Sequence, residues 1–551
     1  MNREDLIILG GGISAVYLAW LLSQDKKFKR LSSPSNIRVI EASTRFGGRV
    51  HSVGGSYGGQ NYGYEAGAAR FFTGHKLLNR LLKHFGYGQD SFIEISGDAA
   101  YHFPIAEKKG VVINGKWVKT HIREAVNILT KTPQVGKYTT REALVKGGMD
   151  KRLVEWLFQA TGYPHILEGN AEATINICRQ DYLANQKYYL FSHGLETLVE
   201  KMVEECRSRG VVFTHGRVSH WNTSTNQISL SDGTTFSGSR IVCAIPPNGL
   251  RGVKITGHEG SDIKTVLGYL TPVPLLRQFS MYRKIPEGIP GKLVTSNPIQ
   301  RQYLGGGGLV QTSYTSGARA TEWISMDQES RRNLLVESQI EAYKGVALPK
   351  PAWNREYYWD GGIHLWKAGL SVDKMYQKIL DCGGDRWWFC GEAYQLEKRW
   401  IESALESADH VYKEIVESVG NSHHQQGGDK DDDYYQWQRF ISGRKTTKKN
   451  RNITKRKKPI AKKDTGSKTW NQSQIDRANS QGRHLIIVSG KVYDVKNWLV
   501  SHPGGQSPLQ DFLGKDATRA MNGNRGKFPE HYHSPIARNI LSNYLVGVFK
   551  N

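Results

Sequence analysis

The chain begins with a short apolar run, Leu6 to Leu9, which is followed by three glycines and a second apolar stretch through Leu22. A short apolar run predicts a buried strand, and a longer one predicts a helix. Strand-like and helix-like runs alternate to about residue 420, which predicts an α/β fold. The pattern stops over residues 421–469 and resumes at Trp470. We therefore predict a large α/β region over residues 1–420, a charged flexible linker over 421–469 and a small domain over 470–551.

The first glycines have the spacing of a dinucleotide-binding motif. Gly10 permits a tight turn, Gly12 lets the backbone approach a pyrophosphate, and Ala15 is small enough for helix–strand packing. The helix that begins here directs free N–H groups at the phosphates. The next strand ends at Glu41, whose carboxylate suits a ribose diol and favours FAD or NAD over NADP. Because 31 residues separate Gly10 from Glu41, we expect an inserted loop at about residues 26–36.

Residues 41–49, with the sequence Glu-Ala-Ser-Thr-Arg-Phe-Gly-Gly-Arg, resemble a signature of the flavin amine oxidase superfamily. That superfamily includes monoamine, polyamine and L-amino-acid oxidases. The resemblance extends over about residues 4–416. It implies an FAD-binding Rossmann-type domain interleaved with a substrate-binding domain. The FAD part is expected at about residues 1–70, 190–260 and 380–420, and the substrate part at about 71–189 and 261–379.

The resemblance also implies which residues contact FAD. Some of them are expected to bring the backbone close to the cofactor or to lay it along the isoalloxazine. Others are expected to bind a phosphate or the flavin, to contact the adenine, or to place a carboxylate near the ribityl chain. Besides Gly10, Gly12, Ala15 and Glu41, they are Gly48, Arg49, Gly67, Arg70, Val218, Glu392 and Ile401. Residues 394–399 contain no cysteine that could attach the flavin, so we expect FAD to bind non-covalently.

Three residues are candidates for the catalytic site. In this family the flavin takes a hydride from the carbon that bears the amine, which implies an amine or amino-acid oxidoreductase. Arg70 resembles the arginine that binds the substrate carboxylate in L-amino-acid oxidases, although a structural ion pair or a flavin contact is an alternative. Trp400 is expected to face the isoalloxazine. Arg277 aligns with a family lysine near flavin N5, and this change predicts a slower reaction with O₂.

A different class of function stays open. Arg399 stands where the family has a small residue, and its side chain could block the substrate cavity. The chain also resembles amine oxidase-like proteins of large DNA viruses. The alternative is therefore a catalytically degenerate scaffold with a structural, nucleic-acid-binding or virion role.

The C-terminal region resembles cytochrome b5. The resemblance rests on residues 492–495 (Val-Tyr-Asp-Val) and 502–505 (His-Pro-Gly-Gly). It implies a small α+β fold with heme b held between His502 and His533. The 31-residue spacing is longer than is usual in the family, and His531 is a competing ligand. A tethered heme, like O₂, is a candidate acceptor for electrons from the flavin.

The net charge of +24 is concentrated in one segment. Residues 444–468 hold twelve Lys/Arg against one Asp. This segment has three possible interpretations. It contacts nucleic acid or an acidic surface, it is a two-part nuclear import signal, or it is a solvated spacer. The five cysteines form no CxxC pair, which favours an intracellular, reducing compartment, either cytoplasmic or nuclear. No apolar stretch has the length of a transmembrane helix.

Overall fold

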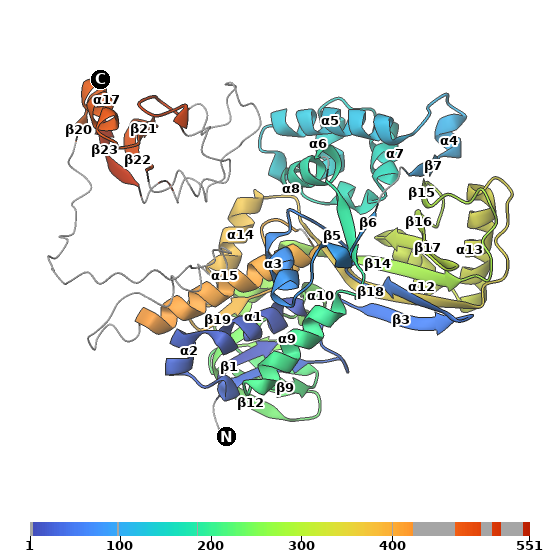
Figure 1. Ribbon diagram of the computed structural model, residues 1–551, viewed down its shortest axis with the longest axis horizontal. Coiled ribbons are helices and arrows are strands. Elements are labelled where there is room, and N and C mark those ends of the chain that lie inside the picture. The colour runs from blue at the N-terminus through green and yellow to red at the C-terminus, as the bar shows by residue number, and fades with distance from the viewer. Residues whose placement is uncertain are drawn as a thin grey trace. The chain divides into compact units, whose positions relative to one another are not determined.

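The computed structural model describes residues 4–95, 99–184, 186–398, 400–421, 469–496, 510–518, 541 and 544–550. The chain divides into two compact units, Met1–Arg444 and Lys445–Asn551. The first is a mixed α/β structure (Figure 1), which confirms the predicted fold class. Among the helices of the described ranges, none is both long and apolar enough to cross a membrane.

An eight-stranded sheet forms the first layer of the N-terminal unit. Its central strand, β1 (Glu4–Leu9), pairs in parallel with β2 (Ile37–Glu41) on one side and β12 (Thr235–Cys243) on the other. The remaining strands are β9 (Val212–His215), β10 (Val218–Asn222), β11 (Gln227–Leu230), β13 (Lys254–Thr256) and β19 (Trp387–Phe389). These strands fall inside the ranges predicted for the FAD part.

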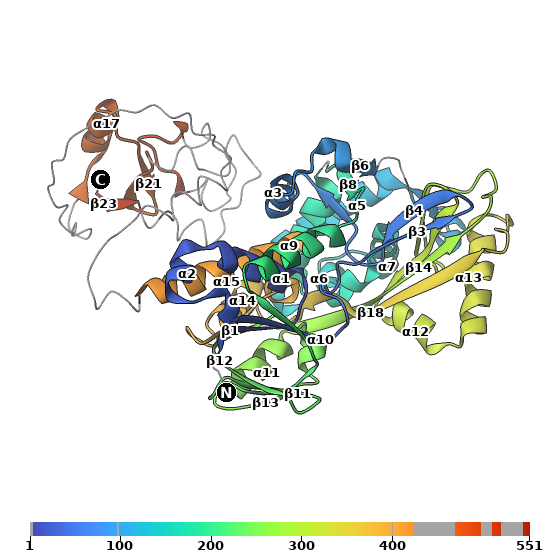
Figure 2. The ribbon, with the colours of Figure 1, turned by 60° about the horizontal axis from the view of Figure 1, so that its bottom comes forward.

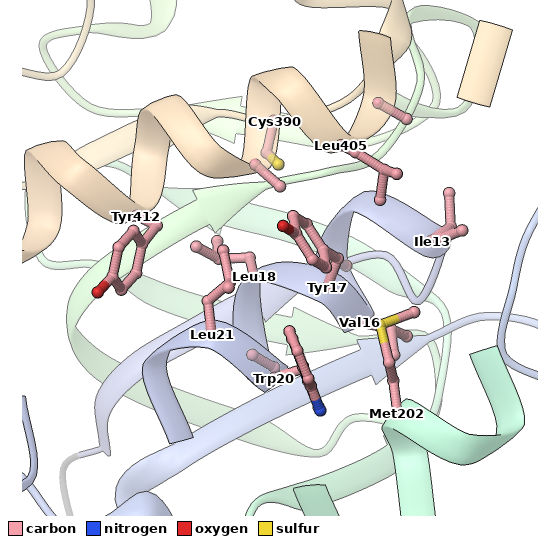
Figure 3. Packing of buried hydrophobic residues seen from close by; sticks show 14 of the residues in the cluster. Ile13, Val16, Tyr17, Leu18, Trp20, Leu21, Met202, Cys390, Leu405 and Tyr412 are labelled. Carbon is pink, nitrogen blue, oxygen red and sulfur yellow. The ribbon is translucent and has the colours of Figure 1, made fainter. Parts of the chain in front are cut away.

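Helices cover both faces of this sheet (Figure 2). On one face α1 (Ile13–Gln24) packs against α9 (Glu196–Ser208) and α15 (Trp400–Asn421). Figure 3 shows Leu18 and Leu21 of α1 beside Tyr412 of α15. On the other face α11 (Gly260–Gly268) and α14 (Val372–Leu380) contribute to a second apolar cluster. Because α1 is buried almost all round, its N-terminus is held rigidly above the end of β1.

The segment expected to be an inserted loop is helical, so that expectation was wrong. Helix α2 (Lys26–Leu31) is followed by a 3-10 turn, Pro34–Asn36. The Asp25 side chain accepts a hydrogen bond from the Phe28 N–H and thereby caps α2, and the Phe28 side chain is 3% exposed. A capping carboxylate and one buried aromatic ring are enough to order this insertion.

A six-stranded sheet forms the second layer. Its longest strands, β14 (Leu270–Met281) and β18 (Trp353–Trp366), are antiparallel neighbours. The sheet continues through β17 (Leu309–Ser316), β16 (Arg301–Leu304), β15 (Lys292–Thr295) and β7 (Ala100–His102). Two helices, α12 (Ala318–Ser325) and α13 (Gln328–Ala342), contribute to the cluster around Leu276 and Trp323.

A group of helices forms a separate apolar cluster that includes Val294 of β15. These helices are α4 (Pro104–Glu107), α5 (Gly115–Lys131), α6 (Thr140–Lys146), α7 (Lys151–Thr161) and α8 (Ala171–Cys178). The smaller elements are β3 (Ser52–Tyr57), β4 (Gln60–Glu65), β5 (Arg70–Phe72), α3 (Lys76–His84), β6 (Phe92–Ile95), β8 (Tyr188–Phe191) and α10 (Pro247–Leu250). Strands β5, β8 and β6 form a three-stranded sheet, and β3 and β4 form a hairpin.

The second unit is a small α+β structure. Its four-stranded sheet has the order β20 (Thr469–Trp470), β23 (Leu545–Phe549), β22 (Lys491–Asp494) and β21 (Leu485–Val488). Helix α17 (Gln472–Ser480) packs in an apolar cluster around Ile475 and Val492. A second cluster gathers around Ile486 and Tyr493, so the described part of this unit has apolar side chains on both faces of its sheet.

Truncation of Leu18 tests the packing of α1. Its side chain is fully buried (Figure 3), whereas that of Leu370 is 43% exposed. We expect Leu18→Ala to lower the free energy of unfolding by about 2–5 kcal/mol, because it leaves a cavity. Leu370→Ala should change it by less than about 0.5 kcal/mol. Urea unfolding followed by tryptophan fluorescence measures both, and an equal effect of the two substitutions would contradict the packing described.

Candidate flavin and substrate site

The turn after β1 leaves open space at the N-terminus of α1. Gly10 has φ +95°, and a Cβ there would lie 2.9 Å from the carbonyl oxygen of Ala244. Gly12, the N-cap of α1, has no neighbouring atom within 4 Å of the place where its Cβ would be. No side chain caps this helix, and its first turn contains no acidic residue. The first N–H groups of α1 are therefore available to an anionic ligand.

Glu41 stabilises the turn after β1 through its side-chain carboxylate. Its Oε2 accepts a hydrogen bond from the Gly11 N–H at 2.6 Å, and its Oε1 accepts one from the Ser43 N–H at 2.8 Å. Each oxygen keeps a lone pair that could accept a ribose hydroxyl. The Gly216 N–H donates to the Glu41 carbonyl at 2.8 Å, which brings the segment before Val218 next to Glu41. The Val218 side chain is itself buried in the apolar cluster under the sheet.

The loop after Glu41 folds back onto the glycine turn. The Gly47 N–H donates to the Gly11 carbonyl at 2.8 Å, and a Cβ on Gly48 would lie 3.1 Å from the Gly12 Cα. Ala15 of α1 is fully buried and permits close packing of the helix. This glycine-lined cradle, with free N–H groups at one side and a carboxylate at the other, fits the pyrophosphate and ribose of a dinucleotide such as FAD.

Arg49 and Glu392 form an ion pair beside the cradle. Arg49 Nη1 lies 2.9 Å from Glu392 Oε2 and also donates to the Gly362 carbonyl at 3.0 Å. His364 Nδ1 lies 2.9 Å from the same carboxylate oxygen. Burial alone would raise the pKa of Glu392, but the charge of Arg49 and the interaction with His364, including its hydrogen bond, hold it well below its ordinary value. Glu392 is therefore a permanent anion, and three segments converge on it.

Lys398 is a site residue that the motifs did not indicate. Its Nζ donates to the carbonyls of Ala393 and Gln395 and lies 4.0 Å from the centre of the Trp366 ring. Burial lowers the pKa of Lys398 to about 7, and the nearby charge of Glu392 opposes part of that effect. The sequence around Lys398 has no pattern that distinguishes it from a surface lysine.

Arg277 connects β14 to the segment that follows β4. Its Nη1 donates to the carbonyls of Glu65 and Gly67, both at 2.6 Å, and its side chain is 8% exposed. The guanidinium carbon lies 4.8 Å from the centre of the Tyr314 ring, directly across the strand pair. Gly67 itself has no room for a side chain, because a Cβ would overlap the Arg49 carbonyl oxygen.

Arg70 and Trp400 lie together in a partly buried aromatic box. The Arg70 guanidinium carbon lies 4.8 Å from the Trp400 ring centre and 4.7 Å from that of Tyr188. Its Nη2 donates to the Tyr163 hydroxyl at 2.7 Å. Trp400 has φ +55°, a left-handed conformation that is unfavourable for an aromatic residue. The structure thus brings two of the predicted catalytic residues into contact.

The start of α15 is fixed by two contacts to the core. Ile401 is 3% exposed and packs in the cluster of α1, α9 and α15. The carboxylate of Glu402 accepts hydrogen bonds from the N–H groups of Leu77 and Leu78, at the start of α3. These contacts hold Trp400 in position beside Arg70.

Several predicted residues lie outside the described ranges. They are Arg399, the heme-ligand candidates His502, His531 and His533, and the basic segment 444–468.

The profile of the flavin containing amine oxidoreductase family matches residues 137–415, slightly more than half of the chain. The chain belongs to this family. A profile for NAD(P)-binding Rossmann-like domains matches residues 8–85, which contain the glycine cradle and Glu41. A third profile, for the cytochrome b5-like heme/steroid binding domain, matches residues 471–550. These matches confirm the resemblances found in the sequence at both ends of the chain.

Solved structures of amine oxidases share the fold of the N-terminal unit. A putrescine oxidase mutant from a structure-based redesign of cofactor binding aligns with a TM-score of 0.57 and 16% identity, over 76% of this chain and 99% of its own. The cyclohexylamine oxidase of Brevibacterium oxydans IH-35A aligns with a TM-score of 0.57 and 14% identity, over 76% of this chain and 100% of its own.

Curated relatives match over a much shorter stretch. Acyl-CoA desaturase 1 of Saccharomyces cerevisiae is 35% identical over 81 residues, which are 15% of this chain and 15% of that protein. Cytochrome b5 of Rhizopus stolonifer is 33% identical over 81 residues, 15% of this chain and 56% of its own. The chain thus spans between about a seventh and just over half of the length of these relatives.

Family membership establishes the coarse chemistry. The chain is a flavin oxidoreductase of the amine oxidase type with a cytochrome b5 domain, and its cofactors are FAD and heme b. The residues around the glycine cradle fit the FAD. Non-covalent attachment of the flavin, and the assignment of individual site residues, stay predictions.

A comparison of two glycines tests the cradle. Gly10 and Gly233 both have positive φ, but only Gly10 lacks room for a Cβ. We expect Gly10→Ala to displace Ala244 and weaken FAD binding by at least about tenfold, whereas Gly233→Ala should keep its flavin. The flavin absorbance per protein after gel filtration measures this. Normal flavin content in Gly10→Ala would contradict the cradle.

The buried carboxyl of Glu65 should make the free energy of unfolding depend on pH. Burial raises the pKa of Glu65 to about 7, although hydrogen bonds from the Leu195 N–H and the Ser52 hydroxyl oppose this. The unfolded chain releases this proton near the ordinary pKa of 4.5. Between these values the folded state binds more protons, so the free energy of unfolding falls as the pH rises.

Substitution of Glu65 should remove this decrease in the free energy of unfolding with rising pH. We expect the wild type to lose on the order of 3 kcal/mol at this carboxyl between about pH 4.5 and pH 7, and Glu65→Gln to lack this loss. Urea unfolding at several pH values measures it. Glu124→Gln, on an exposed part of α5, serves as the control. Parallel profiles for the wild type and Glu65→Gln would show that Glu65 ionises normally.

Proposed function

We propose that the N-terminal unit oxidises an amino acid rather than a simple amine. One observation carries this proposal: the Arg70 guanidinium lies in an aromatic box between Tyr188 and Trp400 and forms no ion pair with any described carboxylate. A partly desolvated guanidinium binds a carboxylate with charge-assisted hydrogen bonds. A substrate carboxylate would supply the missing anion.

The charge around the box supports the same substrate class. Arg277 is buried nearby on β14, and it too forms no ion pair with a described carboxylate. A diamine such as putrescine carries only positive charge and would be repelled here. The structural neighbours named for putrescine and cyclohexylamine share the fold, and at 14–16% identity they do not determine the substrate of this chain.

Each side chain has a separate task in the proposed reaction. When bound, the flavin supplies the hydride acceptor for the carbon that bears the amine. Arg70 would orient the substrate by its carboxylate, and the rings of Trp400 and Tyr188 would exclude water from the reacting carbon. Arg277 would keep a fixed positive charge next to the Glu65–Gly67 segment. The family chemistry requires no separate general base.

The cytochrome b5 domain is the proposed electron acceptor. A heme accepts one electron at a time, so its attachment to a flavin enzyme favours a dehydrogenase, with O₂ as the alternative acceptor. The cysteines are free and buried, and we propose a reducing intracellular compartment, cytoplasmic or nuclear. A nucleic-acid or virion role rests only on the charge of residues 444–468 and on the viral resemblance, and no observation in the described ranges favours it.

The absorption spectrum of the purified full-length protein tests this function. Under anaerobic conditions we expect L-amino acids to bleach the flavin bands, after which the heme bands shift to the reduced form. Putrescine and cyclohexylamine should leave both sets of bands unchanged. A flavin that these amines bleach, and that amino acids do not, would overturn the proposal.

Substitution of Arg70 tests its contact with the substrate. We expect Arg70→Met to raise the KM for amino acids by about 100-fold, because a charge-assisted pair is lost. The flavin content should stay normal, which separates this role from a contact with the cofactor. Arg80→Met, which changes an exposed arginine on α3, should behave as the wild type. An unchanged KM in Arg70→Met would assign Arg70 a purely structural role.

A further inference from the structure

Arg301 is a buried arginine whose charge has no carboxylate partner among the described residues. It begins β16, and its side chain is 5% exposed. Its Nη2 donates to the carbonyl of Thr161, and its guanidinium carbon lies 3.8 Å from the centre of the Tyr163 ring. Its Nε and Nη1 are buried and have no hydrogen-bond partner within the described part of the chain. A buried guanidinium normally pairs with a carboxylate or fills its donors with carbonyls.

The backbone beside Arg301 is shaped to admit the guanidinium. Gly162 has φ +74°, and a Cβ there would overlap Arg301 Nε. Gln300 Nε2 donates to the Gly162 carbonyl at 2.8 Å and so fixes this loop against the start of β16. If Arg301 only joined the end of α7 to β16, that role would explain its hydrogen bond to Thr161 and its stacking on Tyr163. It would leave Nε and Nη1 unexplained.

Positive charges outnumber negative ones around Arg301, where Asp181 is a carboxylate that acts on the neighbouring Tyr182 and Tyr188. Over the ranges that the structure describes, no carboxylate forms an ion pair with Arg301, Arg70 or Arg277. Tyr303 lies two residues along β16 and therefore on the same face. Burial raises the pKa of Tyr303, but the charges of Arg301 and Arg70 more than offset this and bring it below its ordinary value. A positive field of this kind stabilises an anion.

Tyr163 connects Arg301 to the substrate box. Its hydroxyl accepts the hydrogen bond from Arg70 Nη2, and the Arg301 guanidinium stacks on the face of its ring. The two guanidinium groups are thus separated by about one phenol side chain. Two anion-binding groups therefore contact one tyrosine side chain.

We propose that Arg301 binds a second carboxylate, so that the substrate is a dicarboxylic amino acid such as aspartate or glutamate. Arg70 takes the α-carboxylate, and Arg301 takes the carboxylate of the side chain through Nη1, because the Gly162 backbone covers Nε. This inference rests on the proposed function, because it names the substrate class of the same site.

Isosteric substrates test the inference without any substitution. The rate of anaerobic flavin bleaching is measured in the full-length holoenzyme with glutamate and glutamine, and with aspartate and asparagine. These pairs differ in charge but hardly in shape. We expect kcat/KM to be at least about 100-fold higher for the better acid than for its amide. Equal rates, or a preference for the amides, would overturn the inference while the proposed function stands. No bleaching by any amino acid would instead refute the proposed function.

A binding measurement gives a readout that is independent of turnover. Glutarate has two carboxylates and valerate has one on a chain of the same length, and neither has an amine to oxidise. Titration of the oxidised flavin spectrum should give at least about tenfold tighter binding of glutarate. Equal affinities would contradict a second carboxylate site.

Two variants test whether Arg301 causes the preference for the acids over their amides. Arg301→Met should bring the acid-to-amide ratio close to one, and melting temperature and flavin content show whether the variant is folded. Arg319→Met is the matched control, because Arg319 donates only to the carbonyls of Asn297 and Ser296 among the described residues. Its ratio should equal that of the wild type. A folded Arg301→Met with the wild-type ratio would refute the assignment, and if that variant does not fold, the substrate and glutarate comparisons decide.

Discussion

The ion pair between Arg49 and Glu392 connects the two main sheets of the N-terminal unit. Arg49 follows β2 and Glu392 follows β19, both strands of the eight-stranded sheet, whereas Gly362 and His364 lie on β18 of the other sheet. The Glu392 side chain is almost completely buried, so loss of Arg49 would leave a desolvated charge without its partner. The junction between the two sheets therefore depends on one carboxylate that three segments share.

The parts of the site that the sequence revealed are those in which neighbouring residues act together. Gly10 and Gly12 belong to a strand, a turn and a helix that are adjacent in the chain, and Glu41 ends the strand that follows them. Arg301 and Lys398 come from segments without a motif, and only the tertiary fold places them beside Tyr163 and Glu392. No spacing rule links such residues, since the intervening chain could fold in many ways. The heme ligands remain predicted from the resemblance to cytochrome b5 alone.

The insertion after α1 shows a different limit of sequence analysis. Its unusual length suggested an inserted loop, yet Asp25 and Phe28 supply a cap and an apolar anchor for α2. Both signals were present in the sequence. Such short signals do not predict a helix by themselves, because a helix of this length is marginal unless tertiary packing supports it.

The backbone of Trp400 carries a consequence for how this protein can change. A left-handed conformation costs an aromatic residue about 1–2 kcal/mol relative to glycine. Contacts to Arg70 and the anchoring of Ile401 and Glu402 outweigh that cost. Glycine at this position would relieve the strain but would remove the ring that contacts Arg70. The fold thus keeps a strained backbone at the residue that places an aromatic ring beside Arg70.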